Sequence, residues 1–204
     1  MAKTSLPVEG FLLAGGESSR MGRDKVLLDL GGLPLIVRME RLVQKVAGKP
    51  TAIGRPEVMQ PLGIRAVRDE WPGAGPLGGI ATGLRLLEES WALIVACDLP
   101  FLTEEWLKFL VDSAISSTAD AILPMNEGGP EPLCAMYHKR CESVVWLSLD
   151  RGIRKVTSGL VGLSVEFIER QRWKDFDSGG LLFKNMNSPE DYEEAKARFA
   201  ERKG

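Results

Sequence analysis

The 204-residue sequence is poor in cysteine, and it contains no long hydrophobic run. Its three cysteines, Cys97, Cys134 and Cys141, are odd in number and show no CxxC spacing, which argues against a zinc site and favours a reducing compartment. The longest unbroken apolar run, residues 91–97, is far too short to span a membrane. The first ten residues lack the apolar segment of a signal peptide. These absences predict a soluble, cytoplasmic protein with no membrane partner.

The sequence also lacks an excess of charge of either sign. Lysine and arginine total 26 and aspartate and glutamate total 28, so the net charge is −2 and no basic excess is present to hold a nucleic-acid backbone. Hydrophobic residues make up 44% and charged residues 26%, close to the average of globular proteins. The length fits one domain, which we predict to cover residues 1–204. A chain of this size buries about 70% of its unfolded surface, so its fold needs no disulfide or structural metal.

Predicted strands and helices alternate through the first half of the chain. Apolar residues recur at a helical period within residues 33–46, whereas residues 91–97 are apolar throughout, as in a strand covered on both faces. This alternation predicts an α/β fold with a mostly parallel sheet and helices on both faces. Residues 126–131 are predicted to form a mobile loop. The predicted strands are 8–14, 50–54, 64–67, 91–97, 121–124, 132–137, 163–168 and 182–186. The predicted helices are 33–46, 76–89, 103–116, 140–149 and 153–160, with a last helix starting at Ser188.

Glycines and positive charges accumulate directly after the first predicted strand. Residues 13–25 read LAGGESSRMGRDK, with Gly15 and Gly16 followed by Arg20 and Lys25. Neither the Walker A pattern nor GxGxxG occurs in this segment. Glycines at the carboxyl end of a strand let backbone N–H groups approach phosphate oxygens, while Arg and Lys supply charge. The segment therefore predicts a phosphate site, and the alternative is a charged surface turn.

A second glycine cluster, residues 73–79, leads into the helix predicted at 76–89. The free N–H groups and positive dipole of a helix start favour a ligand there. The alternative is that these glycines let the helix pack closely against the sheet, and both interpretations can hold together.

Asp98 follows the most hydrophobic predicted strand. A carboxylate held at the end of a buried strand suits Mg²⁺, which prefers oxygen ligands and takes one or two protein carboxylates. The alternative is that Asp98 caps the next helix, but Thr103 already suits that position. The single histidine, His138, is interpreted as a structural or surface residue rather than a ligand contact.

The glycine-rich segment LAGGESSRMGRDKVLL resembles the signature LAGGxSxRMGxDKxLL of the molybdenum cofactor guanylyltransferases. The resemblance continues, in the family's order, over nearly the whole chain, at residues 75–79, 97–100, 132–137 and 185–191. It implies a three-layer, Rossmann-like nucleotidyltransferase fold. It also implies the reaction: GTP and molybdopterin (Mo-molybdopterin), with Mg²⁺, give the guanine dinucleotide form of the cofactor and pyrophosphate. Transient contacts with proteins that deliver molybdopterin or receive the finished cofactor are a further implication.

The resemblance assigns roles to individual residues. It implies catalytic roles for Arg20, Lys25 and Asp98, with Asp98 also the metal ligand. The implied nucleotide-binding residues are Leu13, Ala14, Gly15, Gly16, Lys25, Asp69, Gly78 and Asp98. Asn185 and Asn187 fall on the molybdopterin side, and a strand at 182–186 would turn their amides to one face. Asn187 alternatively only precedes the helix cap at Ser188. A basic cluster at 151–155 either takes the pterin phosphate or forms a solvated helix face.

Some features depart from the family's pattern. Residues 51–55 read TAIGR where the family often has an asparagine near the base, and Glu131 places a carboxylate beside the motif at 132–137. The main alternative function is that of a molybdopterin cytidylyltransferase. Such enzymes typically carry Ala-Ala-Gly at the first loop and Cys-Asp-Gln-Pro at the strand of the metal ligand. This chain has Leu-Ala-Gly and Cys-Asp-Leu-Pro, and the missing Cβ at Gly15 leaves room for a purine.

Two more distant functions also fit parts of the pattern. One is that of a nucleotidyltransferase for sugar or alcohol phosphates, although such enzymes are usually longer. The second is that of a non-catalytic nucleotide-binding regulator, which would keep the glycine loop but has no need of Asp98 and Lys25.

Overall fold

A mixed sheet forms the centre of the structure, a computed structural model that describes residues 7–15, 24–177 and 179–201. The strand order is β3-β2-β1-β4-β7-β5-β6, and β8 pairs with β5. Neighbours from β3 to β4 are parallel, β7 is antiparallel to both β4 and β5, and β8 is parallel to β5. The strands are β1 (Val8–Leu13), β2 (Thr51–Gly54), β3 (Ala66–Arg68), β4 (Trp91–Ala96), β5 (Ala121–Asn126), β6 (Gly129–Pro130), β7 (Cys134–His138) and β8 (Val165–Ile168).

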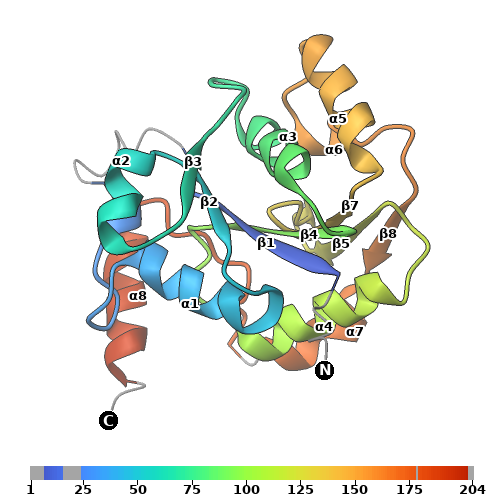
Figure 1. Cartoon of the computed structure of the whole chain (residues 1–204). Coiled ribbons are helices and arrows are strands. Elements are labelled where there is room, and N and C mark those ends of the chain that lie inside the picture. The colour runs from blue at the N-terminus through green and yellow to red at the C-terminus, as the bar shows by residue number, and fades with distance from the viewer. Residues whose placement is uncertain (1–6, 16–23, 178, 202–204) are drawn as a thin grey trace, which may run out of the picture.

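Helices cover both faces of this sheet, so the predicted three-layer α/β architecture is confirmed. Figure 1 shows α1, α4 and α8 on one face and α3, α5 and α6 on the other. The helices are α1 (Leu35–Ala47), α2 (Pro56–Met59), α3 (Pro76–Leu86), α4 (Glu104–Ile115), α5 (Cys141–Asp150), α6 (Val156–Gly159), α7 (Arg170–Trp173) and α8 (Pro189–Glu201). Three 3-10 helices, η1 (Lys25–Leu27), η2 (Gln60–Leu62) and η3 (Lys174–Phe176), complete the described elements.

The sheet separates two hydrophobic clusters. Successive side chains of β1 point to opposite faces, so Phe11 packs in the cluster under α3 and α5 while Leu12 packs in the cluster under α1 and α4. All six residues of β4 are buried, as the apolar sequence of this strand predicts. The central strands are thus fixed from both sides, which holds their carboxyl ends rigidly.

The prediction of a strand at residues 182–186 is wrong. The backbone N–H groups of Leu181 and Leu182 both donate to Asp177 Oδ1, and that of Met186 donates to the carbonyl oxygen of Asp98. These single contacts replace a strand ladder. The segment is instead anchored by its apolar side chains, because the Phe183 ring packs edge-on against Trp173 at 4.9 Å.

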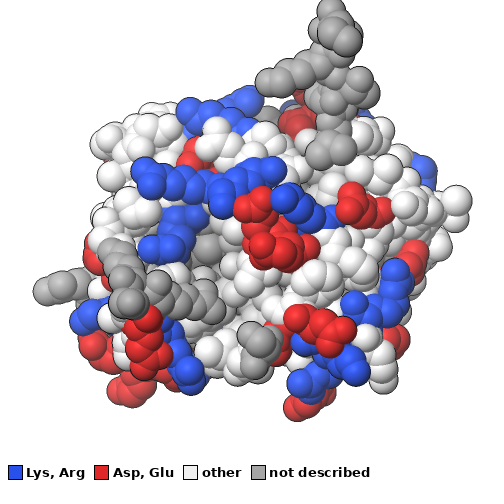
Figure 2. All heavy atoms as spheres, turned by 90° about the horizontal axis from the view of Figure 1, so that it is seen from below, with Lys and Arg blue, Asp and Glu red and all other residues white. Residues whose placement is uncertain are grey.

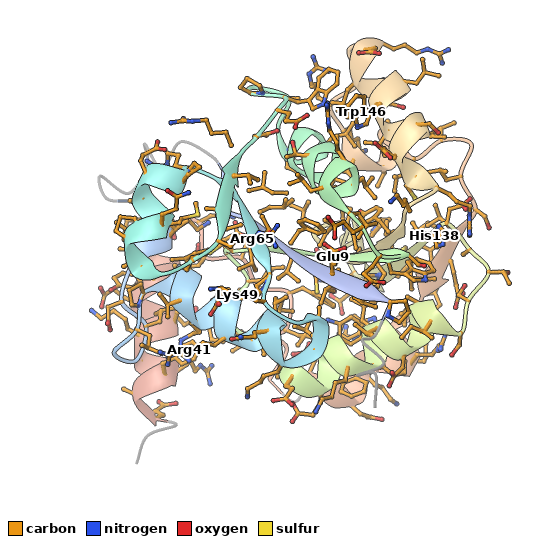
Figure 3. The ribbon with its side chains drawn as sticks, viewed as in Figure 1. Glu9, Arg41, Lys49, Arg65, His138 and Trp146 are labelled. Carbon is orange, nitrogen blue, oxygen red and sulfur yellow. The ribbon has the colours of Figure 1, made fainter. Side chains whose placement is uncertain are left out.

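Further predicted elements differ at their ends. The helix predicted at 76–89 ends at Leu86, because Glu9 Oε1 accepts from the N–H groups of Glu88 and Glu89 and turns the chain toward β4 (Glu9 is labelled in Figure 3). The predicted loop at 126–131 contains the short strand β6, which pairs with the end of β5. The helix predicted at 153–160 is shorter and forms α6.

The surface carries charges of both signs. In Figure 2, positive and negative side chains lie next to one another over the face seen from below. Among the ion pairs of the surface, Glu104 of α4 pairs with both Lys45 of α1 and Lys108. Within the described part of the chain, no helix is long and apolar enough to cross a membrane.

Candidate functional site

A cleft of about 900 Å³ opens where β1, β2, β3 and β4 end, a volume in the range of small-molecule sites. The chain passes from β1 to β2 on one side and reaches β4 on the other side of β1, which makes this edge a topological switch point. Open α/β sheets bind ligands at such points, beyond the carboxyl ends of their strands. Six predicted nucleotide-site residues line the cleft: Leu13, Ala14, Gly15, Lys25, Asp69 and Asp98.

Three polar side chains meet at one end of this cleft. Lys25 Nζ lies 2.9 Å from Asp98 Oδ2 and donates to Asn187 Oδ1 at 2.7 Å. The fold thus brings together residues that are 73 and 162 positions apart in the sequence. Lys25 and Asp98 keep only 17% and 27% of their side chains exposed, so solvent screens their charges less than those of a surface pair.

The two carboxylate oxygens of Asp98 differ in their partners. Its Oδ2 atom pairs with Lys25, whereas its Oδ1 atom is buried and receives no hydrogen bond from any described residue. A buried carboxylate oxygen without a donor is costly unless a cation or a donor reaches it. Asp98 therefore has the chemistry of a cation ligand.

Backbone contacts fix Asp98 in place. The N–H of Cys97 donates to the carbonyl oxygen of Leu13 at 3.0 Å, and the Asp98 carbonyl oxygen accepts from Met186 N at 2.9 Å. Burial, together with the charge of Asp98, raises the pKa of the Cys97 thiol far above its usual value, so this cleft-lining thiol stays protonated and is no nucleophile.

The start of α8 positions Asn187. Asp191 Oδ2 accepts from the N–H groups of both Asn187 and Ser188 at 2.9 Å, and Ser188 Oγ accepts from Asp191 N. The two residues cap the helix reciprocally, as the sequence predicts for Ser188. The hydrogen bonds from Asn187 and Ser188 hold the pKa of Asp191 below its ordinary value.

Asp69, at the other end of the cleft, is also oriented by hydrogen bonds. Its Oδ1 atom accepts from Trp71 N and from Thr82 Oγ1, both at 2.9 Å. Thr82 is 1% exposed and also accepts from Glu70 N, so it locks the turn after β3 to α3. Thr82 is not among the residues predicted from the sequence, although a hydroxyl among the apolar residues of α3 was a usable signal.

The second glycine cluster lines the cleft and also allows close packing, whereas a ligand at the start of α3 stays a prediction. Gly73, Gly75 and Gly79 line the cleft beside the start of α3. Gly78 lies outside this lining, and a Cβ there would stand 2.8 Å from the Trp71 carbonyl oxygen, so Gly78 is required for packing. Its predicted nucleotide contact stays a prediction.

Arg55, the last residue of the segment at 51–55 that departs from the family's pattern, lines the cleft directly after β2. Arg55 forms an ion pair through Nη2 with Oδ2 of Asp24. The neighbouring Gly54 is needed for close approach, because a Cβ there would lie 2.7 Å from the Ala14 carbonyl oxygen. The turn after β2 is thereby held against the end of β1.

Gly16 and Arg20 lie outside the described residues, so their predicted roles stay predictions. Among the described residues that the sequence singled out, some do not line the cleft, and Asn185 is exposed and is one of these. His138 pairs with Trp91 at the opposite end of the sheet, where β1 begins (Figure 3). Glu131 also lies outside the lining, and burial raises its pKa.

The basic cluster is likewise remote from the cleft lining. Arg151 and Lys155 are exposed, and Arg154 donates to the carbonyl oxygen of Leu149 at the end of α5. These contacts favour the solvated helix face over a phosphate contact.

The described residues contain no group of three or more His, Cys, Asp or Glu side chains able to hold a metal ion. This excludes a pre-formed protein cage for zinc in that part of the chain. It is compatible with Mg²⁺, which usually completes its shell with substrate phosphates and water.

Comparisons with known proteins agree with this geometry. Residues 10–164 match the family model described as the MobA-like NTP transferase domain. A probable molybdenum cofactor guanylyltransferase of Bacillus cytotoxicus is 30% identical over 193 residues, 92% of this chain and 95% of that protein. The corresponding protein of Carboxydothermus hydrogenoformans is 32% identical over 189 residues, 93% of this chain and 95% of its own length.

A solved structure extends the likeness to the fold. The crystal structure of molybdopterin-guanine dinucleotide biosynthesis protein A from Archaeoglobus fulgidus gives a TM-score of 0.82 at 25% identity. The match covers 95% of this chain and 99% of that one.

Proposed function

Because this chain belongs to the MobA-like NTP transferase family, we propose that it transfers GMP from GTP to molybdopterin, releasing pyrophosphate. The observation that carries the proposal is the meeting of Lys25, Asp98 and Asn187 in a cleft at the carboxyl ends of β1 to β4. Relatives named probable molybdenum cofactor guanylyltransferases, aligned over more than nine-tenths of the chain, support this choice of substrates.

The triphosphate belongs at the Lys25 end of the cleft. The Lys25 ammonium is a largely buried positive charge, and the cleft lining there also includes Ala14 and Gly15 at the end of β1. A backbone without a Cβ at Gly15 allows close approach of phosphate oxygens. Lys25 would stabilise negative charge as it builds up on the departing pyrophosphate.

The reaction needs no general base from the protein. The nucleophile is a phosphate oxygen of molybdopterin, which is largely ionised at neutral pH because the second pKa of a phosphate monoester is about 6. It attacks the α-phosphorus, a new P–O bond forms, and the bond from the α-phosphorus to the bridging oxygen breaks. Positioning and electrostatics carry most of such a transfer. The cleft lining fits this chemistry, since its described residues include no histidine and its cysteine thiol stays protonated.

A divalent cation fits the site at one residue. Asp98, with its unpartnered Oδ1 atom, is the residue that would hold Mg²⁺, which supplies positive charge to the phosphates when bound. Lys25 pairs with the other oxygen and orients the carboxylate.

The acceptor side is assigned to Asn187 and its surroundings. Asn187 lies beside Lys25 and, like Leu133, lines the cleft on the far side of β1 from Asp69. Its amide can donate to a phosphate or to a pterin carbonyl. Asn185 lies outside the cleft lining, so it would contact molybdopterin only where the bound molybdopterin extends out of the cleft.

The proposal is tested by Mg²⁺-dependent pyrophosphate release from each of the four NTPs, with molybdopterin supplied to the purified full-length chain. We expect release with GTP and little with CTP, ATP or UTP. A preference for CTP would instead identify a cytidylyltransferase. No release with any NTP would contradict the enzyme assignment and favour a nucleotide-binding regulator.

A further inference from the structure

Thr82, in the middle of α3, is a polar side chain in an apolar environment. It is the least exposed of the buried polar side chains in the described part of the chain, and its neighbours Ala81 and Gly83 are buried as well. A buried hydroxyl is destabilising unless it is hydrogen-bonded. The partners of the Thr82 hydroxyl therefore indicate why this position is polar.

Thr82 Oγ1 lies within hydrogen-bonding distance of three groups. It accepts from Glu70 N at 3.0 Å, and it lies 2.9 Å from Asp69 Oδ1 and 3.0 Å from the carbonyl oxygen of Gly78. The hydroxyl has one hydrogen to donate, and the carboxylate is the better acceptor because hydrogen bonds to charged groups are about twice as strong as neutral ones. A carbonyl oxygen inside an α-helix also accepts from the N–H four residues later. The hydroxyl hydrogen of Thr82 is therefore donated to Asp69.

The two carboxylate oxygens of Asp69 have different surroundings. Oδ1 accepts from both Trp71 N and Thr82 Oγ1. Oδ2 makes no hydrogen bond to a described residue and is not buried, and Asp69 lines the cleft. Two donors on Oδ1 fix the rotation of the carboxylate, so Oδ2 is an acceptor oriented in advance for a hydroxyl or N–H group of a ligand.

We propose that Thr82 is a positioning residue that raises the affinity for the nucleotide by directing the Asp69 carboxylate into the cleft. The inference rests on the proposed function and on the predicted contact between Asp69 and the nucleotide. Binding is stronger when a polar group of the site is held in its bound orientation beforehand, because less conformational freedom is lost.

The position of Thr82 in α3 makes it suited to this role. Trp71 belongs to the same turn as Asp69, so the hydrogen bond between them cannot fix that turn relative to the sheet. Helix α3 packs tightly on the central strands, since a Cβ on Gly83 would stand only 3.2 Å from Ile94 Cδ1 of β4. Thr82 thus ties the carboxylate to an element that is itself fixed against the sheet.

A double-mutant cycle measured by calorimetry tests the proposal with the full-length chain, GTP and Mg²⁺. Thr82→Val keeps the size of the side chain and removes the hydroxyl, so we expect it to bind GTP about tenfold more weakly. Thr82→Ser restores the hydroxyl and should recover most of the affinity. In an Asp69→Ala background, Thr82→Val should cause no further loss, because the carboxylate that Thr82 orients is gone. Thr82→Ala, which removes the same hydroxyl, takes the place of Thr82→Val if the valine variant does not fold.

The matched control is Thr51→Val. Thr51, at the start of β2, is 6% exposed, makes no side-chain hydrogen bond to a described residue and does not line the cleft. Its substitution removes a buried hydroxyl far from Asp69 in the sequence and should leave the GTP affinity unchanged.

Three results would overturn the positioning role while leaving the proposed function standing. These are wild-type GTP affinity in Thr82→Val, wild-type affinity in Asp69→Ala, or a loss caused by Thr82→Val that is equally large with and without the Asp69 carboxylate. The last result would mean that Thr82 acts on the fold and not through Asp69. No binding of any nucleotide by the wild-type chain would overturn both the inference and the proposed function.

Discussion

The Asp98 carboxylate combines two roles through its two oxygens. Oδ2 neutralises Lys25, and Oδ1 is buried without a donor among the described residues. A buried carboxylate oxygen without a donor is destabilising, and Asp24 Oδ1 is another such atom among the described residues. Asp98 differs from Asp24 by its position, because it lines the cleft two residues after a strand in which every residue is buried.

Asp98→Asn is expected to lower the rate of pyrophosphate release by on the order of a hundredfold or more, because the amide keeps the shape of the side chain and loses the charge that would hold Mg²⁺. The rate is measured at saturating GTP over a series of Mg²⁺ concentrations, with circular dichroism to verify the fold. Asp150→Asn, at the exposed end of α5, is the control and should leave the rate unchanged. An unaltered rate in Asp98→Asn would refute the metal assignment.

Among the elements, the C-terminal segment has the most direct effect on the site. Residues 181–188 form no strand, yet they carry Asn187 to Lys25 because Phe183 and Met186 are buried and α8 begins immediately afterwards. Tyr192 of α8 also donates its hydroxyl hydrogen to the carbonyl oxygen of Asp29, shortly after Lys25 in the chain. Helix α8 therefore holds Asn187 through its first turn and the segment after Lys25 through Tyr192.

Asp191→Ala is expected to lower the free energy of unfolding at pH 7 by on the order of 1 kcal/mol, through loss of the cap at α8. The folded-state pKa of Asp191 is lowered by the N–H groups of Asn187 and Ser188, so its contribution is present above the unfolded value of about 4. That contribution is lost as the pH falls through the lower folded pKa. Urea unfolding over a pH series should therefore show the wild type and the variant converging in acid.

The matched control for this helix is Glu190→Ala. Glu190 lies in the same first turn and is exposed, and its side chain makes no hydrogen bond to a described residue. A loss of stability as large as that of Asp191→Ala, or a difference for Asp191→Ala that persists unchanged in acid, would count against the capping role.

At the scale of the whole molecule, one sheet serves both hydrophobic clusters. Strands β1 and β4 contribute alternate residues to the two clusters. Loss of the helices from either face would therefore expose apolar residues of these shared strands. The cleft is built from the ends of these shared strands and from the C-terminal segment. Ligand binding should therefore stabilise the chain as a unit.

Urea unfolding of the full-length chain should give coincident transitions by tryptophan fluorescence and far-UV circular dichroism, as expected of a single domain. GTP with Mg²⁺, at a hundred times its Kd, should raise the free energy of unfolding by about 2.7 kcal/mol and move both transitions together. Two separate transitions, of which GTP shifts only one, would contradict the single-domain prediction. Substituting ATP for GTP at the same concentration is the control and should give a smaller shift.

The layered α/β fold, the central strands and the positions of Lys25 and Asp98 after strand ends could all be predicted from the amino-acid sequence. These features are local: an apolar run, a helical period or a glycine pair is visible within a few residues of chain. The same locality explains the wrong strand at 182–186, whose apolar residues are those of a strand but pack against aromatic rings such as Trp173 and form no strand ladder.

Which residues share the cleft depends on the folded molecule as a whole. Lys25 and Asn187 are 162 positions apart, and the orientation of Asp69 by Thr82 or of Arg55 by Asp24 depends on contacts between separate elements. Gly78 and Gly79 are adjacent in the sequence, yet only Gly79 lines the cleft, because α3 turns successive residues to different sides. Side-chain direction and long-range pairing follow from packing, and packing is a property of the folded chain that no short stretch of sequence specifies.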